Sequence, residues 1–224
     1  VVYVSAGEGT SSQGDFHEAL NWASRDKAPV IFHIQNNHYA ISVPIEDQTA
    51  GASVYKISSG YDNLYRFNVD GTDFFETHMA FNKAVDRARK GKGPSLIISD
   101  VVRLLPHSSS DDQRKYRSKE ELEADSMRDP LLIFEEACIK EGIVKEKDFQ
   151  LLKSQIKKQV DEDAEWAEEQ PDPNPTDMMK NIYCQSNDDI RSTQSKKIGN
   201  SIVLVDAINH ALDEELEYNE KLII

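Results

Sequence analysis

The fold is decided by residues 1–37, which read VVYVSAGEGTSSQGDFHEALNWASRDKAPVIFHIQNN. An apolar run at 1–4 enters a turn of small residues at 5–14, whose backbone N–H groups can approach a bound anion. Asp15 caps a predicted helix of about eleven residues, because apolar residues recur at helical spacing (Phe16, Ala19, Leu20 and Ala23). The continuous apolar run at 30–34 is typical of a strand inside a parallel sheet. The stretch therefore predicts a buried strand, a loop, a helix and a second strand.

The same alternation continues along the chain. It predicts a strand at 65–69, a helix from Asp73 to Lys90 with Asp73 as its cap, and a strand at 95–99. Residues 104–118 lose the periodicity and become polar, serine-rich and charged, which is typical of a functional loop. We therefore expect the α/β fold class, with a mostly parallel sheet between flanking helices, followed by a helical extension.

The chain is expected to have four segments of different character. They are an α/β domain at 1–118, a helical part at 119–175, a linker at 176–199 and the start of a second domain at 200–224. Both ends of the chain lie inside apolar runs that are typical of strands. We therefore expect this sequence to be the middle of a longer protein.

Composition excludes several classes of protein. Hydrophobic residues make up 38% of the chain and occur in periodic runs, so the chain is not a disordered one. A net charge of −14 argues against a nucleic-acid partner. The acidity belongs to the second half, because residues 1–118 hold 13 Lys and Arg against 14 Asp and Glu, and residues 119–224 hold 13 against 26. No run approaches the roughly 20 apolar residues of a membrane span, so we expect no membrane partner. The two cysteines are far apart in the sequence, which fits a reducing compartment. We therefore expect a cytoplasmic protein.

Two oxygen-bearing side chains follow the first two predicted strands. Glu8 lies in Gly7-Glu8-Gly9 after the first strand, and Asn36-Asn37 follows the second, with the 26 residues of 10–35 between them. In open α/β sheets, ligands bind in the crevice beyond the carboxyl ends of the strands. Carboxylate and amide oxygens are hard ligands of the kind that Mg²⁺ takes together with substrate phosphates. The spacing therefore indicates a diphosphate that is held through a divalent cation.

These residues resemble the thiamin diphosphate motif, Gly-Asp-Gly followed at a similar distance by Asn-Asn. The segments at 14–21, 39–44 and 107–118 are similar to the α subunit of the decarboxylating first component of 2-oxo acid dehydrogenase complexes, in its branched-chain (2-oxoisovalerate) type. The resemblance covers about residues 1–175. It implies the thiamin diphosphate-binding fold, with thiamin diphosphate and Mg²⁺ as cofactors. Glu8 in place of aspartate is a variant of the branched-chain members that keeps the carboxylate.

The resemblance implies a role for each residue of the motif. Mg²⁺ would be bound by the side chains of Glu8 and Asn37 and by the main-chain carbonyl of Tyr39. The diphosphate would be approached by the backbone N–H groups of Gly9 and Thr10. In this family the cofactor supplies the electron sink, and the protein supplies its conformation and electrostatics.

Two further positions match the family, and two depart from it. Ile41 matches the apolar residue that holds the cofactor in a bent form, and His107 matches the active-site histidine near the diphosphate and the reacting centre. Gln35 stands at the diphosphate-binding position where many members have an arginine, and Pro106 replaces a histidine that often precedes His107. Neither departure removes a metal ligand, but both alter the expected contacts to the diphosphate or the proton transfers of the loop.

The family's activity is the oxidative decarboxylation of a 2-oxo acid. The branched-chain type implies 3-methyl-2-oxobutanoate as the substrate, with transfer of the acyl group to the lipoyl-lysine of an acyltransferase core. Residues 202–218 are similar to the opening helix of the β subunit, which implies an α–β fusion that forms a homo-oligomer at full length. The glutamate that activates the cofactor lies in the β part, so we expect the present stretch to be inactive by itself.

Three alternatives stay open. The substrate could be pyruvate or acetoin, with the same chemistry. The segment could also be a non-catalytic domain that docks lipoyl or acyltransferase partners. A nicotinamide-binding domain is disfavoured, because residues 7–14 do not follow the GxGxxG spacing.

Overall fold

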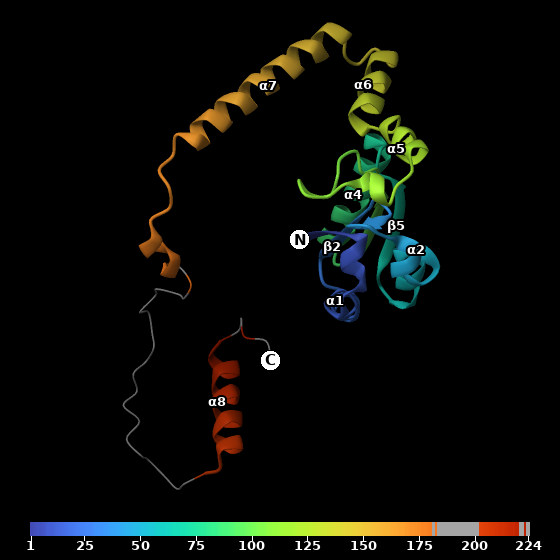
Figure 1. Ribbon diagram of the computed structural model, residues 1–224. Helices are drawn as coiled ribbons and strands as arrows, with labels where there is room; N and C mark the ends of the chain where they lie inside the picture. Colours follow the sequence, from blue (N-terminus) through green and yellow to red (C-terminus); the bar gives the residue numbers. More distant parts are fainter. Residues whose placement is uncertain (181, 183–201, 220–221, 223–224) are drawn as a thin grey trace. The chain divides into compact units, whose positions relative to one another are not determined.

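The computed structural model describes residues 1–180, 182, 202–219 and 222 (Figure 1). It divides into two compact units, Val1–Ala164 and Glu165–Ile224, and the boundary falls within one long helix. Most of the predicted linker at 176–199 lies outside the described residues, as does most of the strand predicted at the end of the chain.

The centre of the first unit is a four-stranded sheet. Its strands are β1 (Val2–Gly7), β2 (Val30–Asn36), β5 (Tyr65–Asp70) and β6 (Ser95–Asp100), in the order β1-β2-β6-β5. All three pairings are parallel, and the register places Gly7 opposite Gln35 and both Asn36 and Asp70 opposite Asp100. The carboxyl ends of all four strands therefore meet at one edge, as expected for the α/β class.

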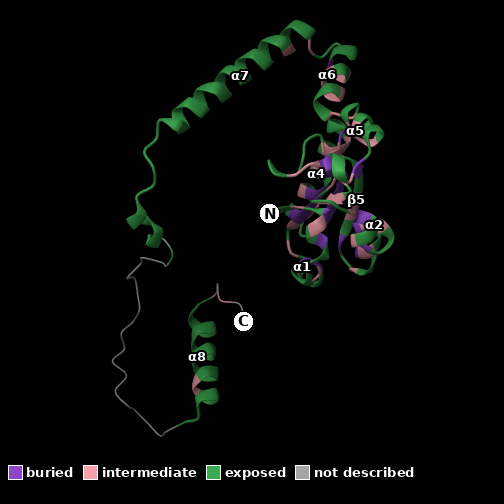
Figure 2. Cartoon of the chain, viewed as in Figure 1, coloured by how far each residue is buried: buried purple, intermediate pink, exposed green. Residues whose placement is uncertain are grey.

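Helices pack on the sheet through two separate sets of buried side chains. One set joins α1 (Gly14–Arg25) to β2 and β6 through Phe16, Leu20, Phe32, Ile34, Leu96 and Ile98. The other set joins α4 (Phe74–Arg89) to the same strands and β5 through Ile31, Val69, Ala80, Ala84 and Ile97. Neighbouring residues of β2 and β6 thus enter different clusters, because successive side chains of a strand point to opposite faces. Figure 2 shows buried residues concentrated in this part of the chain.

Three local predictions can be compared with these elements. Asp73 caps α4 as predicted, since its carboxylate accepts from the N–H groups of Phe75 and Glu76. The prediction that Asp15 caps α1 is wrong, because Gln13 is the N-cap and Asp15 lies in the first turn. The prediction of a buried first strand is also wrong: β1 is an edge strand, and Val2 is 55% exposed.

Short elements connect the strands near the carboxyl edge. A 3₁₀ helix at Glu8–Ser12 follows β1. A two-stranded hairpin, β3 (Tyr39–Ala40) and β4 (Val43–Pro44), follows β2. The remaining connections are α2 (Ile45–Gln48), α3 (Val54–Ile57) and 3₁₀ turns at Ala50–Ala52, Ser58–Gly60 and Gln113–Lys115.

The predicted helical extension is present. It consists of α5 (Lys119–Ser126), α6 (Pro130–Lys140) and α7 (Glu146–Glu168), the last of which has no buried residue (Figure 2). The second unit contains a 3₁₀ helix at Pro175–Met179 and the amphipathic helix α8 (Leu204–Tyr218). Within the described part of the chain, every helix is too short or too polar to cross a membrane.

Candidate functional site

Glu8 and Asn37 lie beside each other, as the spacing of the sequence predicts. Glu8 begins the 3₁₀ helix that follows β1, and Asn37 directly follows β2. Because β1 and β2 are adjacent and parallel, their carboxyl ends are neighbours. The backbone N–H of Asn37 donates to Oε2 of Glu8 at 3.2 Å. The two strand ends therefore bring a carboxylate and an amide side chain to one place.

The carboxylate of Glu8 is buried and only partly satisfied. The residue is 1% exposed, and its Oε1 has no hydrogen-bond partner among the residues that the structure describes. Burial raises the pKa of the Glu8 carboxyl, and the N–H groups of Glu8 and Asn37 oppose this only in part. A buried, unpaired carboxylate oxygen is costly. A bound cation would compensate the charge and favour the ionised form.

Two neighbouring side chains hold the main chain of Glu8 in place through hydrogen bonds. The Ser11 hydroxyl and Nε2 of Gln48 both donate to the Glu8 carbonyl, at 2.6 and 2.8 Å. Oδ1 of Asn37 accepts from the N–H of Tyr39 at 3.1 Å, and a carbonyl oxygen of this kind has a second lone pair. The main chain of Glu8 and the side chain of Asn37 are thus held by hydrogen bonds within the protein.

Nearly all residues predicted for the site line one cavity of about 380 Å³. The lining consists of Gly7, Glu8, Gly9, Thr10, Asn37, Tyr39, Ala40, Ile41 and His107. Gln35 is the predicted site residue that this cavity does not include, and its side chain is exposed on β2. The residues come from three separate parts of the sequence, which only the sheet topology brings together.

Gly9 lets the first loop approach the hairpin closely. A Cβ atom added at Gly9 would lie 2.9 Å from Cβ of Ala40. That distance is shorter than real Cβ contacts, so a side chain at this position would displace the loop or the hairpin. The glycine therefore sets the width of the cavity.

Ile41 occupies a strained position at the tip of the hairpin. It is the first residue of the two-residue turn between β3 and β4, and its φ angle is 58°. A left-handed conformation is unfavourable for a β-branched residue, and such strain is concentrated at functional sites. Its side chain is 55% exposed, so this is not an ordinary core isoleucine.

His107 enters the cavity from the loop that follows β6. The residue is exposed, and its backbone N–H donates to Oδ2 of Asp111 at 2.9 Å. Arg117 anchors the end of this loop: its guanidinium is buried and pairs with Glu121 at 2.8 Å and with Asp125. The loop is therefore tied to α5, which begins directly after it.

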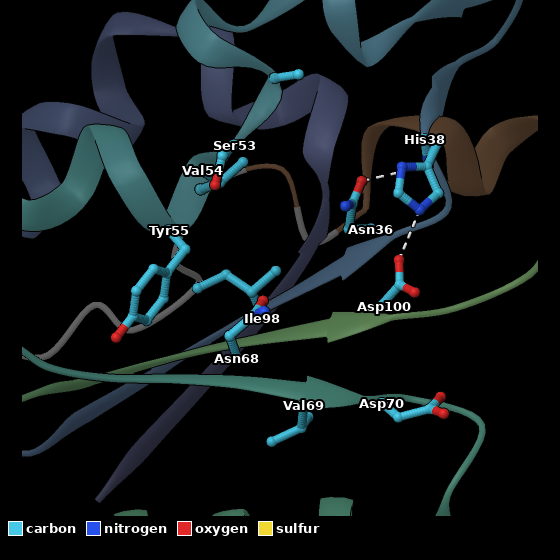
Figure 3. Close-up of a pocket in the computed structure, with 11 residues that line it drawn as sticks. Asn36, His38, Ser53, Val54, Tyr55, Asn68, Val69, Asp70, Ile98 and Asp100 are labelled. Atoms are coloured by element: carbon cyan, nitrogen blue, oxygen red, sulfur yellow. Dashed lines mark hydrogen bonds and ion pairs between the residues drawn. The ribbon is translucent and has the colours of Figure 1, made fainter.

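A second cavity of about 380 Å³ opens at the same edge of the sheet, at the ends of β2, β5 and β6 (Figure 3). Its carboxylates have partners. Oδ1 of Asp100 lies 2.6 Å from Nε2 of His38, and Oδ2 lies 3.3 Å from the Arg128 guanidinium. Burial opposes ionisation of Asp70, but hydrogen bonds from Thr72 and the charge of Arg128 lower its pKa.

Metal-binding chemistry at the Glu8 cavity would have to use a mixed set of ligands. Among the described residues, no group of three or more His, Cys, Asp or Glu side chains is placed to hold a metal ion. The oxygen atoms at hand are the unpaired Oε1 of Glu8, Oδ1 of Asn37 and main-chain carbonyls. This set suits a hard cation such as Mg²⁺, which keeps several ligands from water and phosphate.

Sequence reasoning missed two residues that shape the site. Gln48 holds the Glu8 carbonyl, and Arg103 donates from Nη1 to the carbonyl of Ile41 at 2.6 Å. No local spacing relates either residue to the motif. In the sequence, Arg103 lies shortly after the last strand and shortly before His107 in the same loop. This position was the one indication that its side chain could lie near the site.

Comparison with known proteins places the chain in a family. The family model described as "Dehydrogenase E1 component" matches residues 1–176. The chain is 39% identical to the 2-oxoisovalerate dehydrogenase subunit alpha of Bacillus subtilis, over 82% of this chain and 55% of that protein. It is 42% identical to the 3-methyl-2-oxobutanoate dehydrogenase subunit alpha of Mycobacterium tuberculosis, over 56% of this chain and 34% of that protein. It is 35% identical to the pyruvate dehydrogenase E1 component subunit alpha of Bacillus subtilis, over 82% of this chain and 49% of that protein. The chain thus spans about half the length of these relatives, or less.

Proposed function

The chain belongs to the dehydrogenase E1 component family, and from that premise we propose that it is the α-type part of a thiamin diphosphate-dependent 2-oxo acid dehydrogenase. One observation carries the proposal: Glu8 is buried with an unpaired carboxylate oxygen beside Asn37, at the carboxyl edge of a parallel sheet. A diphosphate bound through a divalent cation is the ligand that such a site fits.

The residues of the cavity would divide the binding between them. Glu8, Asn37 and the carbonyl of Tyr39 would hold Mg²⁺, and the N–H groups of Gly9 and Thr10 would face the diphosphate. A bound Mg²⁺ would remove the cost of the unpaired carboxylate. When bound, thiamin diphosphate supplies the electron sink for decarboxylation.

Ile41 and His107 would act on the cofactor and the reacting centre. The left-handed turn presents the Ile41 side chain at the mouth of the cavity, where an apolar group can hold the cofactor bent. His107 lines the same cavity and is free to hold or move a proton beside the reacting atoms, since its ring makes none of the hydrogen bonds found among the described residues. Gln35 is exposed, so a diphosphate contact from this residue would require its side chain to reach over the strand end.

We also propose the substrate and the partners. The names of the relatives with 39% and 42% identity favour a branched-chain substrate, 3-methyl-2-oxobutanoate. The acyl group would pass to the lipoyl-lysine of an acyltransferase core. A β-type half would complete the active site, and the helix α8 supports its presence in the same chain, because residues 202–218 resemble the opening helix of such a subunit. The 224 residues alone would then be inactive.

Turnover by the full-length protein tests the proposed reaction. Oxidative decarboxylation should be fastest with 3-methyl-2-oxobutanoate, slower with pyruvate and acetoin, and dependent on both thiamin diphosphate and Mg²⁺. Preference for pyruvate or acetoin would overturn the branched-chain assignment and keep the family chemistry. Turnover of none of the three by a protein that binds the cofactor would overturn the proposed substrate class.

A further inference from the structure

Four consecutive residues are shared between the two cavities at the edge of the sheet. Asn37 and Tyr39 line the Glu8 cavity, whereas Asn36 and His38 line the second cavity (Figure 3). His38 therefore separates the two candidate metal ligands of this segment along the chain. The backbone conformation of His38 sets how far the Asn37 side chain lies from the Tyr39 carbonyl.

The backbone of His38 is strained. Its φ angle is 69°, a left-handed conformation that is uncommon in residues other than glycine. For a residue with a side chain, this conformation costs roughly a factor of ten in population. It persists only where surrounding contacts determine it.

Contacts of the main chain and of the ring determine this conformation. The backbone N–H of His38 donates to Oδ1 of Asn36 at 3.2 Å, and the His38 carbonyl accepts from the N–H of Ile45 at 2.9 Å. The ring reaches β6, where Nε2 lies 2.6 Å from Oδ1 of Asp100 (Figure 3). At this distance the Nε2–H group donates to the carboxylate, and hydrogen bonds of this kind are short and strong. Any residue could make the two main-chain contacts, whereas the bond to Asp100 requires the His38 side chain.

Asp100 is held independently of His38. It is the last residue of β6, and the strand register places it opposite Asn36. Its second oxygen, Oδ2, lies 3.3 Å from the Arg128 guanidinium. The pair with His38 is partly exposed, since 48% of the His38 side chain and 37% of the Asp100 side chain are accessible. Its contribution is therefore limited to about fivefold in population, which offsets part of the backbone strain.

We propose that His38 is a positioning residue of the metal site. Its bond to Asp100 supports the left-handed backbone that places the Asn37 side chain and the Tyr39 carbonyl for one metal ion. The role in metal binding rests on the proposed function, because it takes Asn37 and Tyr39 as ligands. The support of the backbone rests on the contacts of His38 itself.

Amide hydrogen exchange of the full-length protein, measured by mass spectrometry without metal or cofactor, tests the support of the backbone. His38→Ala loses the bond and keeps the strain, so exchange at 36–45 should accelerate roughly tenfold. His38→Gly also loses the bond, but glycine accepts positive φ. Its exchange should therefore stay within about threefold of the wild-type rate.

Substitutions of Asp100 test the same bond from its other end. Asp100→Leu should accelerate exchange at 36–45 about fivefold in the wild-type background. In the His38→Gly background, the same substitution should change the rate less than about twofold, because no bond is left to break. Asp100→Asn is the conservative variant, since its amide oxygen can still accept from Nε2, and it should change exchange in this segment less than about twofold.

A comparison of two cations tests the role in metal binding. Mg²⁺ demands near-ideal octahedral geometry, whereas Ca²⁺ accepts irregular sets of oxygen ligands. In fluorescence titrations, His38→Ala should weaken Mg²⁺-dependent binding of thiamin diphosphate roughly tenfold and Ca²⁺-dependent binding less than about threefold. His38→Gly should restore the Mg²⁺-dependent affinity to within about threefold of the wild-type value. A general loss of stability would weaken binding with both cations equally, and glycine would not rescue it.

Two results would overturn the inference. One is equal exchange at 36–45 in His38→Ala and His38→Gly, which would mean that the bond does not support the left-handed backbone. The other is an equal loss of Mg²⁺-dependent and Ca²⁺-dependent binding in His38→Ala. Failure of the wild-type protein to bind thiamin diphosphate with either cation would instead contradict the proposed function. The exchange experiment uses no ligand, so the two failures are distinguishable.

Discussion

Two cavities of about 380 Å³ lie at the carboxyl edge of the same sheet, and each has at least one carboxylate in its lining. In one, Asp100 is paired with His38 and Arg128, and Asp70 accepts hydrogen bonds from Thr72. In the other, Glu8 is buried with an unpaired oxygen, and the nearby hairpin contains a strained residue. Left-handed residues line both cavities, since His38 and Ala52 have φ angles of 69° and 50°. Size, position and strain therefore do not distinguish the cavities, whereas the unpaired oxygen of Glu8 does.

This difference identifies the cavity that a ligand would stabilise. An unpaired buried carboxylate costs free energy of folding. A cation bound to Glu8 would recover part of that cost, but the paired carboxylates of the other cavity have nothing comparable to gain. Substitutions that change one cavity at a time test this difference.

The largest effect is expected for Glu8→Gln. The substitution keeps the size of the side chain and removes the charge that a divalent cation requires. We expect Mg²⁺-dependent binding of thiamin diphosphate to weaken by about 100-fold, measured by fluorescence titration of the full-length protein. Asp100→Asn, in the other cavity, is the matched control and should change the affinity less than about threefold. Equal losses in the two variants would remove the distinction between the cavities.

Gly9→Ala should have the next largest effect. The new Cβ atom would lie 2.9 Å from Cβ of Ala40, so the hairpin must shift away from the loop that approaches the diphosphate. We expect about tenfold weaker cofactor binding, in line with the cost of overpacking. Gly14→Ala serves as the control, because a Cβ there meets no atom within 4 Å. Full affinity in Gly9→Ala would show that the close approach has no role in binding.

Lowering the pH should weaken cation binding at the Glu8 cavity. Burial raises the pKa of Glu8, so protons compete with Mg²⁺ at a higher pH than for an ordinary glutamate. Below that raised pKa, the apparent Mg²⁺ affinity should fall roughly tenfold per pH unit. Titrations in buffers between about pH 8 and pH 5 measure this dependence. An affinity that stays constant until about pH 4 would mean that Glu8 is not the titrating ligand.

The smallest effect is on the stability of the ligand-free protein. A carboxyl whose pKa is raised by folding contributes stability below its unfolded pKa and loses it as the pH rises through the folded pKa. At neutral pH the ionised Glu8 therefore destabilises the fold. Glu8→Gln should raise stability by about 1 kcal/mol, or roughly 2–4 °C in Tm. Asp100→Asn should lower Tm, because it removes a partner from His38 and Arg128. A lower Tm for Glu8→Gln or a higher Tm for Asp100→Asn in a thermal melt would contradict this explanation.

The sequence predicted the parallel sheet and the meeting of Glu8 with Asn37, because apolar periodicity defines strands and parallel strands share one edge. It wrongly predicted that β1 is buried, since a continuous apolar run does not distinguish a central strand from an edge strand. Arg103 and Gln48 were also beyond prediction. Their contacts to Ile41 and Glu8 join positions 62 and 40 residues apart, and such contacts depend on the tertiary structure, not on local spacing.

Calorimetric titration of the full-length protein with thiamin diphosphate measures whether the Glu8 cavity binds this cofactor through a metal ion. In the presence of Mg²⁺, we expect a binding heat with one cofactor for each Glu8 cavity in the assembled protein. In EDTA, the heat should disappear. Absence of heat with Mg²⁺ would contradict the cofactor assignment and favour a non-catalytic assembly domain, and an equal heat with and without Mg²⁺ would contradict the role of Glu8 as a metal ligand.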